Sequence, residues 1–388
     1  MTATTVATRP ATAPELARVL RDASESHRTV RVRGTGTKDY LGDLLPTDAI
    51  VETAALAGIV AHVPADLTVT VRAGTRLADL RQALAEAGQM LALDPPHGDG
   101  ATIGGIVSAN SSGFLRARYG GIRDQLIGTE LALADGTVAR SGGRVVKNVA
   151  GYDLNKLLLG ALGTLGVITE CTFKVLPLPK ASRGLVGRFR RAADAFGAAD
   201  TLARTSARPA ALVAHTTARD HWQLHVQADG EPSAVARTIE LAADAARGDG
   251  TAEAVDDIAR ALAPLRELVE QPEGAIVRAA LPPAAQSSFA EVAIGLDGFA
   301  RLVADAASGI VRVQLRGGDD ELVAGTDALL AAARVCGGSA RVERRPEHLR
   351  SRIGAWGDVD LPGLFLMRRL KAAFDPNGVL EPGRGPVR

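Results

Sequence analysis

The sequence predicts an α+β fold in two main parts, and three observations lead to this prediction. Short alternating strands in the first 180 residues end at glycine-rich turns. Pro177 and Pro179 close the last of these strands, and the composition then shifts towards alanine and arginine. From residue 184 to 344, predicted helices alternate with paired strands, which is typical of a sheet backed by helices. At 388 residues the chain is long enough for two or three domains.

The first part begins with a predicted helix at 12–26, with Thr12 as its cap. Residues 29–38, TVRVRGTGTK, alternate as a strand and stop at a glycine-rich turn. Residues 68–74 form another alternating strand, and Thr75 is expected to cap the helix that follows.

The turn Gly34-Thr35-Gly36-Thr37-Lys38 superficially resembles two nucleotide-binding motifs but matches neither. The third glycine of GxGxxG is missing, and the chain contains no GxxxxGK[ST]. Two interpretations stay open from these residues alone. The backbone N–H groups of the turn form an anion-binding nest, or the turn is an ordinary glycine-rich one.

Residues 94–121 are the most unusual stretch of the chain. They hold seven of its 42 glycines, and small residues fill most of the other positions. Because glycine lacks the Cβ that keeps a ligand away from the backbone, such a stretch suits close approach to a large polar ligand. A small-residue helix is expected to begin near Thr102, and its free N–H donors suit a phosphate or a flavin carbonyl. This favours a dinucleotide ligand.

The remaining elements follow from turn signals and periodicity. Asp135-Gly136 predicts a hairpin. The C-terminal helix at 363–374 ends at Asp375-Pro376, and Leu366 and Met367 are interpreted as core residues. Further helices are predicted at 153–159, 191–205, 232–246, 283–294 and 320–335, and further strands at 184–189, 210–216, 221–228, 274–280, 308–315 and 339–344.

Composition excludes several functions. A net charge of +1 without a basic block, together with 3% aromatics, argues against nucleic-acid binding. Cys171 and Cys336 are the only cysteines, so neither a disulfide framework nor a CxxC redox or iron–sulfur motif is present, and both are expected to be small hydrophobes. No run of 18 apolar residues and no secretory signal is evident, so a cytoplasmic protein without a membrane span is expected.

Three segments in order, RVRGTGTK, DPPHGDGATIGGIVSANSSG and GTLGVIT, resemble the FAD-binding domain of the vanillyl-alcohol oxidase / p-cresol methylhydroxylase (PCMH) superfamily. The tail FDPNGVLEPGR resembles that family's C-terminal signature, in which the chain returns to the FAD domain. Within the superfamily, VKNVAGYDLNKLLLGALGTLGVITE and the preceding DPPH are most similar to the FAD-binding E subunits of bacterial glycolate oxidases.

The resemblance implies a two-part PCMH-type FAD-binding domain at 1–179, an α+β cap (substrate) domain at 180–345, and a C-terminal segment at 346–388 that packs back on the FAD domain. It also implies a set of FAD-binding residues. They are Gly34, Thr35, Gly36, Thr37 and Lys38 around the pyrophosphate, Pro96, Thr102, Ile103, Gly104, Gly105, Ser108, Asn110, Ser112 and Gly113 along the rest of the dinucleotide, and Gly166 and Ile168 in the last turn.

The function implied is FAD-dependent oxidation of a small 2-hydroxy acid, glycolate or D-lactate, by hydride transfer to flavin. The implied partners are other glycolate-oxidase-type subunits that carry flavin and iron–sulfur centres. The catalytic base is not identified, so a second hypothesis is a non-catalytic, flavin-carrying subunit for electron transfer or assembly. An NADPH-dependent reductase is less favoured, because no nicotinamide site is recognisable.

Two departures from the family narrow these expectations. Members with covalent flavin often have a histidine in the first loop, and this chain has none there, with His97 the only histidine near the motifs. Non-covalent FAD is therefore expected. The paired-histidine metal motif of the D-lactate dehydrogenase branch is also missing. His221 and His225 read as part of a strand without a third ligand, so no metal site is expected.

Two groups of residues keep open interpretations. Lys147 and Tyr152 could bind substrate, or they pack on the cofactor while Asn148 and Asp153 cap a short helix. The second group is a set of charged residues that forms a solvated cluster, or a wall for FAD phosphates or an anionic substrate. It comprises Arg116, Arg118, Arg123 and Asp124.

Overall fold

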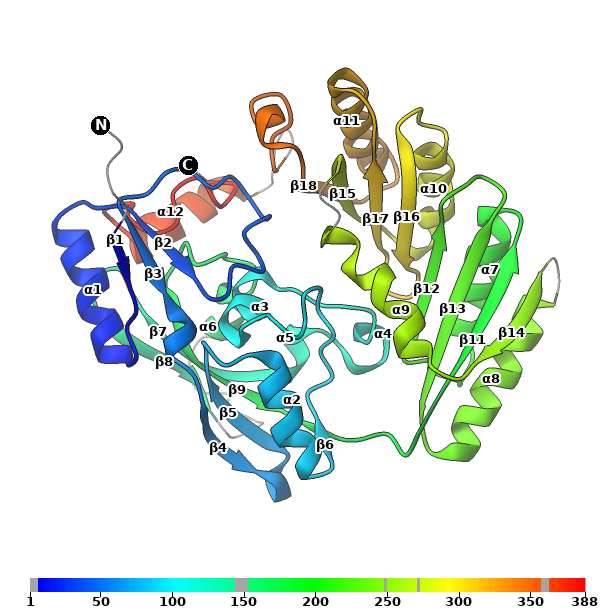
Figure 1. The fold of residues 1–388 in the computed structure, drawn as a ribbon, viewed down its shortest axis with the longest axis horizontal. Coiled ribbons are helices and arrows are strands. Elements are labelled where there is room, and N and C mark those ends of the chain that lie inside the picture. The colour runs from blue at the N-terminus through cyan, green and yellow to red at the C-terminus, as the bar shows by residue number, and fades with distance from the viewer. Residues whose placement is uncertain (1–5, 144–152, 248–249, 271–272, 357–362, 388) are drawn as a thin grey trace. The chain divides into compact units, whose positions relative to one another are not determined.

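The computed structural model describes residues 6–143, 153–247, 250–270, 273–356 and 363–387. The chain divides into two compact units (Figure 1). Unit 1 comprises 1–112, 120–178 and 359–388, and unit 2 comprises 113–119 and 179–358. The division near residue 179 coincides with the composition shift. The short segment 113–119 and the residues just after 345 group with unit 2, whereas the resemblance placed them in the first domain and in the C-terminal segment.

Unit 1 is built on two main sheets. A parallel sheet has the order β1-β3-β2, and an antiparallel sheet has the order β4-β5-β9-β7-β8, with β6 and β10 forming a separate pair. The strands are β1 (Val6–Thr8), β2 (Val30–Arg33), β3 (Ala49–Glu52), β4 (Ile59–Val63), β5 (Thr68–Arg72), β6 (Gln89–Met90), β7 (Leu126–Ala132), β8 (Val138–Gly142), β9 (Val167–Lys174) and β10 (Leu176–Pro177). The helices are α1 (Ala13–Glu25), α2 (Leu77–Glu86), α3 (Ile103–Ala109), α5 (Ile122–Gln125), α6 (Leu154–Leu158) and α12 (Leu364–Phe374).

Local sequence signals explain most of these elements. Thr12 caps α1 by accepting a hydrogen bond from the Glu15 N–H, as predicted. The hairpin between β7 and β8 turns at Gly136, which has a φ of +81°. The Thr75 prediction was wrong, because Arg76 occupies the cap position of α2. The Thr75 hydroxyl instead bonds the backbone of Gly58, and this contact links two segments of unit 1.

The C-terminal segment returns to unit 1 through an isolated bridge between Leu380 and Val30 of β2. The backbone N–H of Val30 on β2 bonds the Val379 carbonyl, and the Glu381 N–H bonds the Val30 carbonyl. Lys371 on α12 anchors the helix, because its ammonium group bonds Asp375 and the carbonyls of Thr164 and Leu380.

The core assignment on α12 was wrong. The side chains of Leu366 and Met367 are 51% and 41% exposed. Periodicity alone could not reveal this, since α12 is attached by polar bonds from Lys371 rather than by an apolar face.

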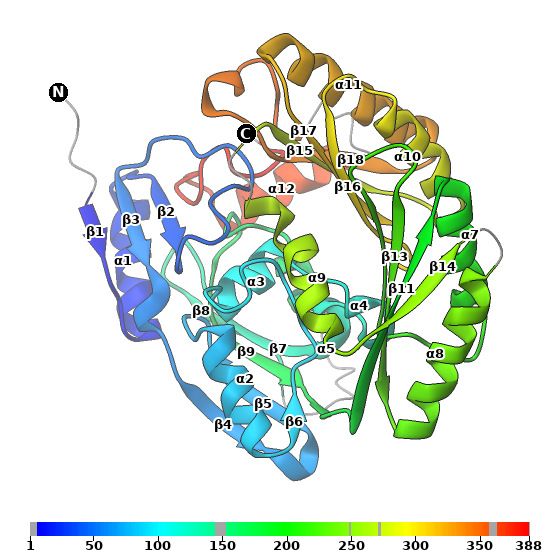
Figure 2. The same cartoon turned by 45° about the vertical axis from the view of Figure 1, so that its right-hand side comes forward.

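Unit 2 is an eight-stranded antiparallel sheet with helices packed on it (Figure 2). The strand order is β14-β11-β13-β12-β16-β17-β15-β18. The strands are β11 (Ala181–Phe189), β12 (Ala211–Thr216), β13 (Trp222–Gly230), β14 (Thr251–Val255), β15 (Ala275–Ala280), β16 (Phe299–Asp305), β17 (Ile310–Leu315) and β18 (Ser339–Arg344). The helices are α4 (Arg116–Tyr119), α7 (Ala192–Ala203), α8 (Pro232–Ala246), α9 (Ile258–Arg266), α10 (Gln286–Ile294) and α11 (Asp319–Val335).

The two faces of this sheet have different partners. Helices α7, α8, α10 and α11 cover one face, where Trp222, Phe289 and Leu329 lie in the larger core of unit 2. A smaller core contains Ile276 and Val303 of the sheet together with Ile258 and Leu262 of α9. Strands β14 and β16 and helix α9 were not predicted. The strand TAEAV of β14 is largely exposed and so lacks a buried alternating face. Helix α9 does carry Ile258, Leu262 and Leu265 at helical spacing, but it also holds Pro264, a residue that normally breaks a helix.

None of the described helices is both long and apolar enough to span a bilayer.

Candidate functional site: a glycine-lined groove in unit 1

A groove in unit 1 is enclosed by three stretches that are distant in sequence. It contains about 630 Å³ of space outside the protein atoms, part of it open to solvent. Its walls come from the turn after β2, from helix α3 and from the turn before β9, and the C-terminal tail adds a fourth contribution. The lining residues are Val32, Arg33, Gly34, Thr35, Gly36, Thr37, Lys38, Asp39, Thr53, Ala73, Thr102, Gly104, Gly105, Ser108, Ala109, Leu162, Gly163, Gly166, Val167, Ile168, Glu381 and Arg384.

The turn after β2 packs directly against the start of α3. A Cβ placed on Gly34 would lie 2.3 Å from the Thr102 hydroxyl oxygen, so a larger residue there would displace the side chain that caps α3. Gly36 has a φ of +80°, and its carbonyl accepts a hydrogen bond from the Asp39 N–H at 3.0 Å. The Thr35 hydroxyl donates to the Gly100 carbonyl at 2.6 Å. Glycine is therefore needed at 34 for close approach between two motifs and at 36 for the turn itself.

Helix α3 begins at the predicted place. Thr102 is its cap, and the Thr102 hydroxyl accepts a hydrogen bond from the Gly105 N–H at 3.3 Å. The paired glycines have different surroundings. A Cβ on Gly104 would meet the Ala73 Cβ at 2.8 Å, whereas a Cβ on Gly105 would meet only the Thr102 hydroxyl, at 3.1 Å. Gly104 thus serves helix–strand packing, and Gly105 keeps its side of the helix clear.

Lys38 lines the groove although its side chain is largely withdrawn from solvent. The residue is only 6% exposed, and its ammonium group donates to the Pro96 carbonyl at 2.7 Å. Its own carbonyl accepts a hydrogen bond from Arg384 at 2.7 Å. The lysine therefore ties the first turn to the DPPH segment and to the tail, and it adds a positive charge beneath the groove.

Glu381 and Arg384 are groove residues that sequence reasoning did not single out. Both are at least 95% buried, and they form an ion pair at 3.3 Å. Burial is the main influence on Glu381 and raises the pKa of its carboxyl, although Arg384 opposes it. The Nε of Arg384 is buried and has no hydrogen-bond partner in the protein. The tail motif EPGR was the only signal that could have indicated these two residues.

The sequence-derived cofactor residues divide between the groove and its surroundings. Gly34, Thr35, Gly36, Thr37, Lys38, Thr102, Gly104, Gly105, Ser108, Gly166 and Ile168 line the groove. The other five predicted cofactor residues do not line the groove. Ile103 is fully buried in the unit 1 core, Pro96 offers its carbonyl to Lys38, Asn110 is the exposed end of α3, Ser112 lies beyond that helix, and Gly113 groups with unit 2.

The residues for which the sequence left two interpretations open lie in different parts of the structure. Lys147, Asn148 and Tyr152 lie outside the described residues. Asp153 precedes α6 at its cap position, but its side chain makes no capping bond. The Asp124 carboxylate accepts from the Gly121 N–H at the start of α5, and Arg118 donates to the Arg208 carbonyl in unit 2. None of the four charged residues from 116 to 124 lines the groove of unit 1.

The histidine pair of the structure differs from the pair considered in the sequence. His221 is exposed, while His225 on β13 lies against His215 on β12, with 3.1 Å between the two Nε2 atoms. Burial lowers the pKa of both imidazoles to about 4. Both are therefore neutral at pH 7. His97 does not line the groove.

The N-terminal part of the chain matches a known family model. Residues 4–142 match the family model described as an FAD binding domain. This chain carries an FAD-binding domain. Over 155 residues it is 43% identical to "Glycolate oxidase subunit GlcE" of Escherichia coli, covering 40% of this chain and 44% of that protein. Over 201 residues it is 34% identical to "D-lactate dehydrogenase [cytochrome] 1, mitochondrial" of Saccharomyces cerevisiae, covering 50% and 34%. The match thus spans less than half of either relative.

The fold agrees with this assignment. The chain superposes on p-cresol methylhydroxylase with a TM-score of 0.77 at 20% identity, covering 98% of this chain and 88% of the other. It therefore has the PCMH-type fold that the four motifs predicted. In sequence, the part of the chain that matches is similar to a glycolate oxidase subunit and to a D-lactate dehydrogenase.

The groove residues fit an FAD. Its walls are glycine, alanine, serine and threonine, which leave room for a dinucleotide, and a side chain at Gly105 would reduce that room. The unpartnered Nε of buried Arg384 and the ammonium group of Lys38 favour an anionic ligand.

Proposed function

We propose that FAD binds non-covalently in the groove of unit 1. The turn Gly34–Lys38 and helix α3 would hold the dinucleotide, and Gly166 and Ile168 would contact it from the turn before β9. Arg384 joins this set, because its buried guanidinium lines the groove with a donor to spare. The absence of a histidine from the first turn supports a dissociable flavin. Mass spectrometry of the denatured protein should therefore give the bare polypeptide mass, and a mass increased by one FAD would contradict this.

The proposed reaction is oxidation of a small 2-hydroxy acid, glycolate or D-lactate. Bound flavin supplies a hydride acceptor. The chain contributes a pre-formed groove whose glycines and short side chains set the position of the cofactor, and buried Lys38 and Arg384 balance its charge. The printed names of the two relatives support this substrate class.

We further propose that the chain works beside other subunits of a glycolate-oxidase-type assembly, which would carry flavin and iron–sulfur centres. The relative named as subunit GlcE supports this proposal. The observation on which the function mainly depends is the groove formed by three FAD-family motifs together with the C-terminal tail.

A reductive titration tests the function. The purified chain is first shown to contain flavin by its absorbance, and glycolate or D-lactate is then added without oxygen. Bleaching of the flavin by either acid supports a complete enzyme. Bleaching that requires added partner subunits supports a flavin-carrying subunit that relays electrons. A chain that purifies and refolds without binding FAD would overturn both versions.

A further inference from the structure

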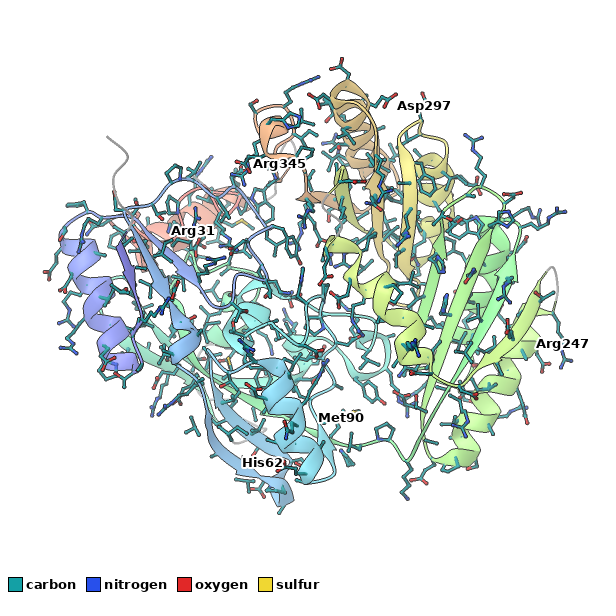
Figure 3. The ribbon with its side chains drawn as sticks, viewed as in Figure 1. Arg31, His62, Met90, Arg247, Asp297 and Arg345 are labelled. Atoms are coloured by element: carbon teal, nitrogen blue, oxygen red, sulfur yellow. The ribbon has the colours of Figure 1, made fainter. Side chains whose placement is uncertain are left out.

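Three arginines lie side by side across the last strands of the unit 2 sheet. Arg278 on β15 is paired in register with Arg312 on β17 and, on its other side, with Arg341 on β18. Residues directly opposite one another point to the same face of a sheet, and like charges in such positions repel. This row therefore needs negative charge nearby. The end of β18 can be located in Figure 3 by the labelled Arg345, which directly follows the strand.

One buried carboxylate, that of Glu343, lies among these arginines and accepts hydrogen bonds from two of them. Glu343 on β18 is 2% exposed, and its Oε2 accepts from the Arg312 Nε at 2.8 Å. Its Oε1 accepts from an Nη2 of Arg341 at 3.1 Å. The Arg278 Nε lies 3.7 Å from the same Oε1, beyond hydrogen-bond distance. Two of the three guanidinium groups thus hold the carboxylate, and the third only faces it.

The row keeps unused donors and excess charge. Among the described residues, the Arg278 side chain donates no hydrogen bond, and the buried Nε of Arg341 has no partner. The side chains of Arg278 and Arg341 are only 22% and 28% exposed. The three arginines of the row share the Glu343 carboxylate, and Arg116 of α4 adds repulsion on Arg278. Burial, followed by the charges of Arg341, Arg312 and Arg116, lowers the pKa of Arg278 to about 9 despite Glu343. Uncompensated charge of this kind is costly unless an anion binds.

We propose that Arg278, together with Arg341 and Arg312, which Glu343 holds in place, forms an oxyanion site that binds the carboxylate of a small organic acid. The planar guanidinium fork matches a carboxylate or a phosphate, and Arg278 supplies an uncommitted fork. The identification of this acid with a 2-hydroxy acid substrate depends on the proposed function, whereas the site itself does not.

Isothermal titration calorimetry on the full-length, FAD-loaded protein tests the site. The probes are oxalate, glycolate, D-lactate and inorganic phosphate, each with the wild type and with Arg278→Gln. The carboxylates should bind the wild type. Arg278→Gln should lower their affinity about tenfold or more, because one charge-assisted contact is lost. Arg316→Gln is the matched control, because Arg316 lies one residue beyond β17 with its side chain 51% exposed. It should bind as the wild type does.

Arg278→Gln is not expected to damage the fold, because the removed side chain donates no hydrogen bond and relieves repulsion. Its melting temperature without ligand should match or exceed that of the wild type. Arg278→Lys keeps the charge without the fork and should bind carboxylates with intermediate affinity. Equal carboxylate affinity in Arg278→Gln and the wild type would overturn the site, and phosphate binding tighter than every carboxylate would overturn the choice of ligand.

The test distinguishes failure of the anion site from failure of the proposed oxidase function. Carboxylates that bind through Arg278 but never bleach the flavin would leave the anion site standing and remove the oxidase proposal. Normal bleaching by glycolate or D-lactate in Arg278→Gln, with unchanged affinity, would keep the oxidase and remove the anion site.

Discussion

The Glu381 carboxylate accepts a hydrogen bond from the backbone N–H of Val32 at 2.8 Å, and this bond joins the last residues of the chain to strand β2. The same carboxylate faces Arg384. A residue near the C-terminus therefore completes the wall of a groove whose first turn lies at residues 34–38. FAD binding should depend on this distant contact.

Glu381→Ala is expected to weaken FAD binding and to lower the free energy of unfolding by about 3 kcal/mol, because Arg384 loses its buried partner. Glu381→Gln is the matched control. It keeps an oxygen for the Val32 N–H and removes only the negative charge that faces Arg384. Flavin fluorescence titrations and urea unfolding should separate the two variants. Equal loss in both would contradict the role given to the Val32 bond.

Gly105→Val should release FAD without unfolding the protein. Its Cβ would meet only the Thr102 hydroxyl, so the added methyl groups enter the groove. Gly104→Val is the comparison, because its Cβ would lie 2.8 Å from the Ala73 Cβ, and overpacking of this kind costs about 1–3 kcal/mol. We expect a lower melting temperature for Gly104→Val. For Gly105→Val we expect low flavin content with a melting temperature equal to that of flavin-free wild type. Full flavin occupancy in Gly105→Val would exclude cofactor contact at this residue.

The ionised Glu343 carboxylate is expected to make the stability of unit 2 depend on pH in the acid range. Burial alone would raise the pKa of its carboxyl, but Arg312, Arg341 and Arg278 outweigh burial and lower the pKa from 4.5 to about 2. A carboxyl with a lowered folded-state pKa stabilises the fold above 4.5, and this contribution is lost as pH falls from 4.5 towards 2. The loss should approach about 3 kcal/mol. The stability difference between wild type and Glu343→Gln should therefore shrink across that range, and a difference independent of pH would contradict the pairing.

The buried pair His215 and His225 is expected to make folding stability depend on pH over a second, higher range. Burial lowers the pKa of each imidazole from 6.5 to about 4. The unfolded chain takes up these protons first, so stability falls as pH drops from 6.5 towards 4 and returns as pH rises. For His225 the full loss is about 3 kcal/mol. Urea unfolding between pH 4 and 7 should show this slope in the wild type and a shallower one in His225→Gln. An identical slope in the variant would mean that His225 titrates normally.

Much of the groove was predictable because its signals are local. The turn at 34–38, the cap at Thr102 and the hairpin at Gly136 each depend on a few neighbouring residues whose backbone needs are encoded in place. The alternation of helices and strands in unit 2 was likewise visible over most of its length. The exposed strand β14 was missed because it has no buried alternating face, and helix α9 was missed because Pro264 interrupts an otherwise helical pattern.

What the sequence determined by itself was the cofactor class, since glycines and short side chains at spaced positions are needed wherever backbone approaches a dinucleotide. The tertiary structure decided which of those residues reach the groove. Ile103 and Gly104 belong to adjacent positions of one helix, yet one is core and the other lines the site, because a helix turns successive residues to different faces. It also brought Arg384 to Lys38, and Arg278 between Arg312 and Arg341. Such pairings arise only when segments distant in sequence come together in the fold, so no local pattern could have shown them.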